Sequence, residues 1–342
     1  MWPVEARVQP PAGAARHLPK LSPCNEIRHM RPLGFALLVA SFACARPCDA
    51  ASASRADTVV VFSAASLAVP IRAALDSFAR RTGAVVQQEN GASLELARRI
   101  TELGRVPDVI ALADHEVFPQ QLVPRAASWY VRFARNRMVV AFTDRSHGAA
   151  QLTAANWHRV LTRPDVRVGR SDPRLAPVGY RTLLLYRLAE GYYRVPGLAS
   201  RLEARTPRAL IRANASELVA LLQAGELDYI LDYESLARAN RLRFVALPPA
   251  IDLGDPVRAS QYARASVRVA RRTDTTTYRG APIVYAATVP RAAPHPSAGQ
   301  RFLRYLLSPA GQSVLRAHAV DALRVPEVVG DSVPPALHAM RR

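Results

Sequence analysis

From residue 58 onward, short apolar runs alternate with segments of helical spacing along most of this 342-residue chain. Thr58–Phe62 reads as a strand, Val69–Arg81 has apolar positions at helical spacing, and Ala84–Gln88 reads as a second strand. Strands that alternate with helices favour a parallel or mixed sheet, not separate all-α and all-β regions. The pattern therefore predicts an α/β fold.

The middle of the chain repeats this alternation, with buried strands predicted at Val166–Gly169 and Tyr229–Tyr233. Two α/β units, with the chain crossing between them near residues 142–146 and 280–285, indicate two lobes with a cleft between them. The predicted division is a first lobe over 54–143 plus 283–342 and a second lobe over 144–282.

The segment that begins at Met30 is typical of a secretory signal peptide. Arg31 supplies a positive charge, Leu33–Ala45 is apolar but short for a membrane span, and Ala51-Ser52-Ala53 has the form that signal peptidase cleaves. We therefore expect residues 1–53 to be a leader, with translation starting at Met30 and cleavage near Ala53 or Ala45. The mature protein is expected in the periplasm.

The three cysteines, Cys24, Cys44 and Cys48, all precede Ala53. A mature chain that starts there has no cysteine, which excludes disulfides, thiol catalysis and cysteine metal sites. Anchoring as a lipoprotein through Cys44 is the alternative to cleavage, although the bulky Phe42 fits that signal poorly. No later segment approaches the length of a membrane-spanning run.

The formal net charge of +19 is carried almost entirely by arginine, because Lys20 is the single lysine. The arginines are scattered along the chain, whereas nucleic-acid binders more often concentrate basic residues among aromatic ones. We therefore expect no nucleic-acid partner, although a positive field attracts small anions.

Small polar residues follow predicted strands at three helix starts: 63–66, 90–93 and 214–217. A fourth junction, 177–180, opens a helix with a proline-glycine turn. Helix N-termini expose unpaired N–H groups with partial positive charge, which suits an oxyanion. Helix capping alone explains any single junction equally well, and Asn214 with Glu217 resembles a capping box.

Catalytic motifs are absent: the chain has no G-x-S-x-G elbow, no H-E-x-x-H and no phosphate-binding loop. Four aspartates at strand edges could serve acid–base chemistry: Asp108, Asp114, Asp228 and Asp232. Asp228 and Asp232 are four residues apart on a strand and point to the same side. Capping and loop hydrogen bonds explain these aspartates as well, and an exported enzyme using Asp108, Asp114 or Asp228 stays an alternative.

Several stretches carry a resemblance to a known family, and they run in order from Thr58 to Leu337. They are "FSAASL", "NGASLELARRITELGRVPDVIALAD", "NWHRVLTRPDVRVGRSDPRLAPVGYRTLL", "ELVALLQAGELDYILDYESLA", "FVALPPAIDLGDP", "GAPIVYAATVP" and "FLRYLLSPAGQSVLRAHA". Over this length the chain resembles the periplasmic molybdate/tungstate-binding proteins of ABC transporters, in the branch known from archaea.

The resemblance implies a type II periplasmic binding protein, whose two α/β lobes are joined by a hinge and close on an oxyanion. It implies a monomer that is not an enzyme, needs no cofactor and delivers molybdate or tungstate to an ABC permease in the inner membrane. The ligand-binding positions of the family fall on Ser66, Ser93, Val178, Ala215 and Tyr233. Ser63, by contrast, is expected to be structural.

Archaeal relatives add two carboxylates to the coordination of the metal, and this sequence has no clear counterpart of either. Ala176 stands before the proline-glycine turn where they have an aspartate, and the second position aligns with Ala215 or, after a small shift, Glu217. Glu217 also has its capping role. If both carboxylates are absent, neutral donors alone hold the oxyanion, and a receptor for sulfate or another tetrahedral oxyanion stays an alternative.

Overall fold

The computed structural model describes residues 58–270, 274–335 and 337. The predicted leader, its start at Met30, its cleavage sites and Cys44 lie outside these residues, so export and anchoring stay predictions. Among the helices of the described part, none combines the length and apolarity needed to cross a bilayer.

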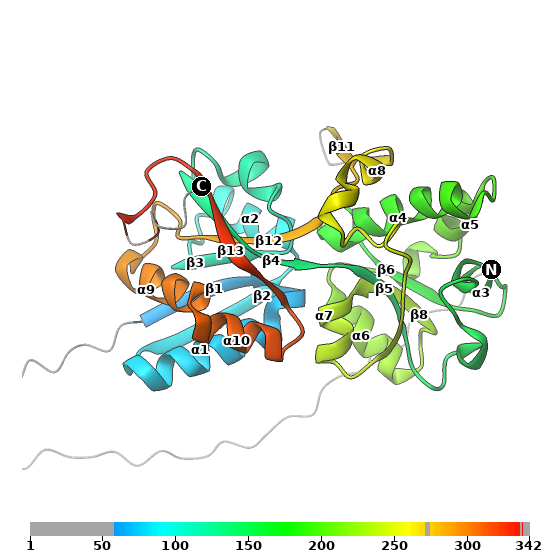
Figure 1. Ribbon diagram of the computed structural model, residues 1–342, viewed down its shortest axis with the longest axis horizontal. Coiled ribbons are helices and arrows are strands. Elements are labelled where there is room, and N and C mark those ends of the chain that lie inside the picture. The colour runs from blue at the N-terminus through cyan, green and yellow to red at the C-terminus, as the bar shows by residue number, and fades with distance from the viewer. Residues whose placement is uncertain (1–57, 271–273, 336, 338–342) are drawn as a thin grey trace, which may run out of the picture. The chain divides into compact units, whose positions relative to one another are not determined.

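A six-stranded mixed sheet forms the first lobe, in the order β13-β4-β12-β3-β1-β2 (Figure 1). Its strands are β1 (Thr58–Ala64), β2 (Val85–Gly91), β3 (Val109–Leu112), β4 (Trp129–Asn136), β12 (Ile283–Thr288) and β13 (Asp321–Gly330). β1 runs parallel to β2 and β3, whereas β12 is antiparallel to β3 and β4, and β13 to β4. Every residue of β3 is buried, as its continuous apolar run predicts.

Helices α1 (Ala68–Thr82), α2 (Ser93–Thr101), α9 (Pro296–Leu307) and α10 (Pro309–Ala317) belong to this lobe. α9 buries residues at three- and four-residue spacing, among them Phe302 and Leu306, and it contacts β1 and β3. Phe302 meets Phe78 of α1 edge to face, with ring centroids 5.5 Å apart. An amphipathic pattern of this kind places one apolar face of each helix against the sheet.

A five-stranded sheet forms the second lobe, in the order β7-β6-β8-β5-β9. Its strands are β5 (Met138–Phe142), β6 (Val168–Ser171), β7 (Ile211–Arg212), β8 (Tyr229–Tyr233) and β9 (Arg243–Ala246). The helices of this part are α3 (Trp157–Leu161), α4 (Pro177–Tyr193), α5 (Leu198–Ala204), α6 (Ala215–Ala224), α7 (Glu234–Ala239) and α8 (Ala259–Tyr262). Two further strands, β10 (Ser266–Ala270) and β11 (Thr275–Arg279), pair antiparallel with each other. The predicted α/β class with two lobes is confirmed.

The chain passes from the first sheet to the second at Arg137, the one residue between β4 and β5. This differs from the crossing expected near residues 142–146, because residues 129–142 form two consecutive strands that no turn separates. The chain rejoins the first sheet at β12, which begins at Ile283, and the return expected near 280–285 stays a prediction. We propose Arg137 as the first lobe boundary in place of residue 143.

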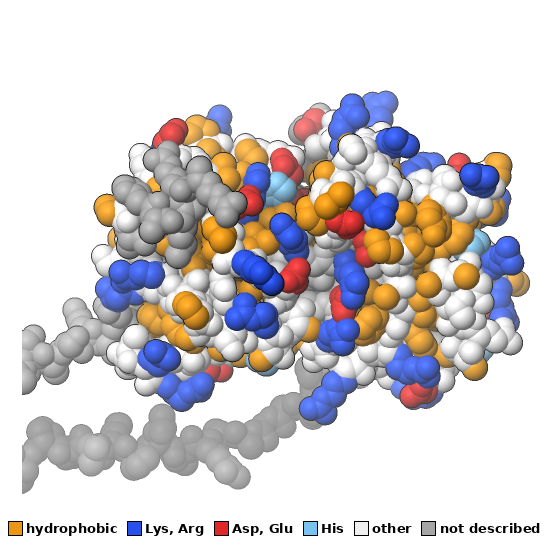
Figure 2. Space-filling model, in the orientation of Figure 1, with side chains coloured by type: hydrophobic (Ala, Val, Ile, Leu, Met, Phe, Trp, Pro, Cys, Tyr) orange, Lys and Arg blue, Asp and Glu red, His pale blue; other side chains and the backbone are white. Residues whose placement is uncertain are grey.

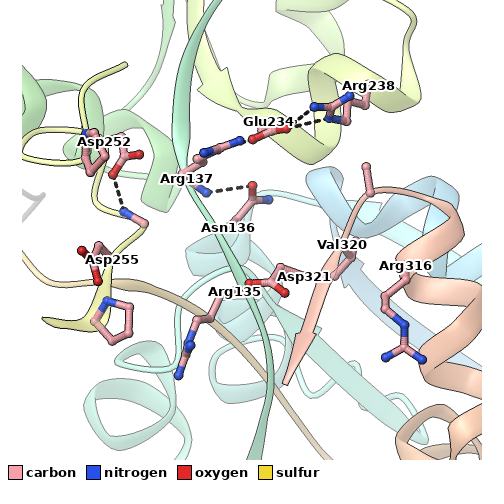
Figure 3. Close-up of a pocket in the computed structure, with 14 residues that line it drawn as sticks. Arg135, Asn136, Arg137, Glu234, Arg238, Asp252, Asp255, Arg316, Val320 and Asp321 are labelled. Carbon is pink, nitrogen blue, oxygen red and sulfur yellow. Dashed lines mark hydrogen bonds and ion pairs between the residues drawn. The ribbon is translucent and has the colours of Figure 1, made fainter. Parts of the chain in front are cut away.

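A pocket of about 710 Å³ opens where the chain changes sheet (Figure 3). Within it, Glu234 of α7 pairs with Arg137 and, at 2.6 Å, with Arg238. The Asn136 side chain accepts a hydrogen bond of 2.9 Å from the Arg137 N–H. Asn136 is buried, and its Nδ2 donates to Ser235 of α7 and to Tyr285 of β12, so hydrogen bonds hold the crossing to both lobes.

Candidate functional site

All five ligand positions predicted from the sequence line one small cavity: Ser66, Ser93, Val178, Ala215 and Tyr233. Ser66 and Ser93 come from connections of the first sheet, and the other three come from the second lobe. The cavity volume is about 20 Å³, whereas sites for drug-sized organic ligands measure about 300–1,000 Å³. Such a cavity suits a compact inorganic ion and excludes sugars and peptides.

The two serines lie at helix starts of the first lobe and are almost fully buried. Ser66 belongs to the short 3₁₀ helix Ala65–Leu67 that leads into α1, and Ser93 is the first residue of α2. Ser66 Oγ accepts a hydrogen bond of 3.0 Å from the Tyr285 hydroxyl, and Ser93 Oγ accepts one of 3.1 Å from the Ala113 N–H. Each serine therefore retains its own proton for a ligand.

Tyr233 is the last residue of β8 in the second lobe, and its hydroxyl oxygen also accepts a hydrogen bond from the protein. Its hydroxyl accepts a hydrogen bond of 2.7 Å from Nη1 of Arg181. Burial raises the pKa of Tyr233 well above its usual range, so the hydroxyl keeps its proton. Among the described residues, none accepts a hydrogen bond from Ser66, Ser93 or Tyr233, which leaves three hydroxyl donors for an anion.

Backbone N–H groups complete the cavity wall at the starts of α4 and α6. Val178 is the second residue of α4, after Pro177, and Ala215 is the first residue of α6. The first N–H groups of a helix have no partner inside it and carry the positive end of the helix dipole. With Ser93 at the start of α2, three helices of nine or more residues begin at this cavity.

Gly179 allows α4 to begin this close to the preceding strand. A Cβ at Gly179 would lie 2.6 Å from the carbonyl oxygen of Ser171 and 2.6 Å from the nitrogen of Pro173, closer than real Cβ atoms approach. The glycine of the proline-glycine turn is therefore required by packing, and it holds the Val178 N–H at the cavity.

Glu217 does not line the cavity. Its side chain is exposed, its N–H donates to Asn214 Oδ1 at 3.2 Å, and its Oε1 accepts from Asn214 Nδ2 at 2.7 Å. The structure thus favours the capping role of Glu217 over the ligand role. Ala176 does line the cavity, as a small apolar residue where archaeal relatives are expected to have aspartate.

Ser63 makes structural hydrogen bonds, as expected. It is buried, donates to Asn90 Oδ1 at 2.6 Å and accepts from Gln88 Nε2 at 2.9 Å. These bonds tie β1 to β2, and Ser63 does not line the cavity.

Sequence reasoning missed the buried cation behind Tyr233. Arg181 is 3% exposed, its Nη1 also donates to the Ala113 carbonyl at 2.7 Å, and its Nη2 lies 3.0 Å from Asp114 Oδ2. Tyr180 donates to the same carboxylate. Because Asp114 follows β3 and Arg181 lies on α4, this ion pair joins the two lobes beside the cavity. The Gly-Tyr-Arg order after Pro177 is the only local signal for it.

Asp232 is the second residue whose role the sequence did not reveal. It is fully buried and lines the cavity, and its Oδ1 accepts a hydrogen bond of 2.7 Å from the Tyr233 N–H. Its Oδ2 has no hydrogen-bond partner among the described residues. Burial raises the pKa of Asp232 to about 7. Sequence reasoning placed Asp228 and Asp232 on one strand, whereas Asp228 precedes β8 and only Asp232 reaches the cavity.

The other three aspartates considered for acid–base chemistry are held by structural partners. Asp108 accepts from the N–H groups of Val60 and His295, and Asp228 from those of His147 and Arg167. Asp114 pairs with Arg181, and none of the three lines the small cavity. Among the described residues, no cluster of His, Cys, Asp or Glu is arranged to hold a metal cation.

A two-lobed α/β fold with a small cavity of converging helix starts defines a class, that of periplasmic binding proteins. Solved structures with this fold include a periplasmic molybdate-binding protein of Azotobacter vinelandii, with a TM-score of 0.53 and 17% identity over 77% of this chain and 98% of that one. The sulfate-binding protein SubI of Mycobacterium tuberculosis has a TM-score of 0.56 and 13% identity, over 78% and 88%. Both are similar to this chain in fold alone.

The chain belongs to the bacterial extracellular solute-binding protein family, whose model matches residues 59–319. Proteins of this family bind solutes and are not enzymes. The molybdate/tungstate-binding protein WtpA of Pyrococcus abyssi is 33% identical over 300 residues, which cover 80% of this chain and 87% of that protein. A solute-binding protein of Petrotoga mobilis is 37% identical over 274 residues, covering 79% and 85%.

Proposed function

We propose that this protein captures molybdate or tungstate outside the cytoplasm and delivers it to the permease of an ABC importer. The observation that supports this most is the trio of buried hydroxyls, Ser66, Ser93 and Tyr233, whose oxygens already accept hydrogen bonds from the protein. Donors fixed in this way, together with helix N-termini, suit an anion that carries only acceptor oxygens. The similarity to molybdate/tungstate-binding relatives supports the choice of anion.

Selectivity over sulfate would come from size, because metal–oxygen bonds are longer than sulfur–oxygen bonds and fixed donors cannot contract onto the smaller ion. The ligand favours closure of the lobes because it binds the closed state more tightly than the open state. Opening of the lobes would therefore release it. Export would proceed through the predicted signal peptide, and N-terminal sequencing of the mature protein would identify its cleavage site.

Isothermal titration calorimetry with molybdate, tungstate and sulfate tests this proposal. We expect submicromolar binding for the first two anions only. Tight binding of sulfate without binding of molybdate would establish the alternative receptor, a sulfate-binding protein. If none of the three anions releases heat or raises the melting temperature, the proposed function is wrong.

A further inference from the structure

The cavity wall contains a carboxyl group as well as hydrogen-bond donors. Asp232 is fully buried on β8, and while its Oδ1 accepts the Tyr233 N–H, its Oδ2 has no partner among the described residues. Buried polar atoms are almost always hydrogen-bonded, so an unpaired oxygen at a cavity points to a missing partner. An ionised carboxylate offers only acceptor oxygens, which cannot bond to the oxygens of an anion.

Within the described part of the chain, no basic side chain forms an ion pair with Asp232. Its pairing partner on β5 is Val139, and its face of β8 also bears Ile230 in an apolar cluster. Arg170 on β6 follows the pairs Val168–Tyr229 and Gly169–Ile230, so it lies beside Leu231 and projects to the opposite face.

The charged groups on the helices packed against β8 are engaged elsewhere. Arg181 of α4 pairs with Asp114 and bonds to Tyr233, while Glu234 of α7 pairs with Arg137 and Arg238. Glu217 of α6 is exposed and bonded to Asn214.

The remaining titratable groups near Asp232 are tyrosines. Burial raises the pKa of both Tyr233 and Tyr285, so they stay neutral near pH 7. Among the described residues, no cationic side chain therefore pairs with Asp232, and its burial favours the protonated carboxyl.

A dianion and an ionised carboxylate in one small buried cavity would repel each other strongly. Protonation removes this repulsion and turns Oδ2 into an O–H donor. On the basis of the proposed function, we propose that binding of the oxyanion is coupled to uptake of one proton from solvent by Asp232, whose Oδ2–H then donates to an oxygen of the anion. The burial that raises the pKa of Asp232 to about 7 lowers the cost of this step at neutral pH.

Proton uptake makes binding depend on pH in a defined way. Well above pH 7, where Asp232 is ionised in the empty protein, the dissociation constant should rise about tenfold per pH unit. Below pH 6 it should become nearly constant. Asp232→Asn carries a permanent N–H donor at this position, so its affinity should not vary with pH between 6 and 8.5.

Calorimetric titration with tungstate at pH 8.5, in two buffers of different ionisation enthalpy, measures the protons taken up. We expect nearly one proton per anion for the native protein and none for Asp232→Asn. Asp228→Asn is the matched control, because Asp228 directly precedes the same strand and lies outside the cavity. With its fold verified by circular dichroism, it should take up the same proton as the native protein.

Tungstate binding without proton uptake would overturn this inference and leave the proposed function intact. So would equal uptake by Asp232→Asn, or an Asp232→Asn variant that binds weakly at every pH, since that result would mean that the ionised carboxylate itself contacts the metal centre. If molybdate, tungstate and sulfate all fail to bind at pH 6, both the proposed function and this inference fall.

Discussion

At the scale of single residues, three of the five predicted ligand positions have a local signature. Ser66, Ser93 and Ala215 stand at helix starts, and a helix start can be recognised from a few neighbouring residues. Arg181 and Asp232 have no such signature, because their roles depend on partners or walls contributed by distant segments. Glu217 is the opposite case, because its hydrogen bonds are made locally with Asn214 in a capping pattern.

Ser93→Ala should weaken tungstate binding by about 1–3 kcal/mol, because one hydrogen bond to a charged, buried ligand is lost. Ser63→Ala is the control, since Ser63 is equally buried on β1 but bonds to Asn90 outside the cavity. Calorimetry should give native affinity for the control. An unchanged affinity in Ser93→Ala would remove Ser93 from the site.

Asp232 should also make the empty protein less stable as pH rises. The pKa of Asp232 is about 7 in the folded protein and about 4 in the unfolded chain. Between pH 4 and pH 7 the folded state therefore binds more protons than the unfolded state, and the free energy of unfolding falls as pH rises through this range. Asp232→Asn should therefore raise the free energy of unfolding at pH 8, by about 4 kcal/mol at most, and have little effect at pH 4. Urea denaturation at both pH values measures this; an equal effect at both would argue against the raised pKa.

At the scale of elements, α4 contributes both to the cavity and to the ion pair between the lobes. It presents Val178 to the cavity at its first turn, and one turn later Arg181 reaches Asp114 and Tyr233. The apolar spacing predicted this helix, and the proline-glycine turn predicted where it begins. It did not predict the sheet to which β5 belongs, because strands of either sheet look alike when no turn separates them.

Gly179→Ala should abolish tungstate binding or reduce it severely, because its Cβ would meet Ser171 and Pro173 backbone atoms at 2.6 Å and displace the start of α4. Gly191→Ala on the same helix is the matched control, since nothing lies within 4 Å of its added Cβ. The control should retain affinity and gain about 0.5–1 kcal/mol of stability. Normal binding by Gly179→Ala would show that the start of α4 is free to shift.

Arg181→Met should destabilise the protein by about 3–5 kcal/mol, because Asp114 is left buried without its cation. It should also weaken tungstate binding, because Tyr233 loses the donor that orients its hydroxyl. The double variant Arg181→Met/Asp114→Asn separates these effects: thermal denaturation should show much of the stability restored, whereas calorimetry should show affinity still reduced. Full recovery of affinity would mean that Arg181 acts on stability alone.

At the scale of the whole molecule, positive charge is widespread. Basic side chains are spread over the face seen in Figure 2, with acidic ones among them, in keeping with a formal charge of +19 for the full sequence. A field of this sign attracts anions of every kind, whereas on the proposed function the small cavity selects among them.

The association rate for tungstate should therefore fall as salt concentration rises, because salt screens the field that steers the anion. The dissociation rate should change much less, since the donors around the bound ion are buried. Stopped-flow measurement of tryptophan fluorescence from 10 to 300 mM sodium chloride checks this. An association rate independent of salt would mean that the net charge has no part in capture.

The position of Asn136 has one more consequence. Its Nδ2 donates to the Tyr285 hydroxyl at 2.6 Å, and Tyr285 donates to Ser66, so a continuous chain of hydrogen bonds runs from the crossing between sheets to a proposed ligand donor. A change in the angle of the crossing would rotate the serine proton even if no residue of the cavity changed. On the proposed function, substitutions at the crossing should therefore change the affinity for the anion, and homologues with the same cavity residues need not bind it with the same strength.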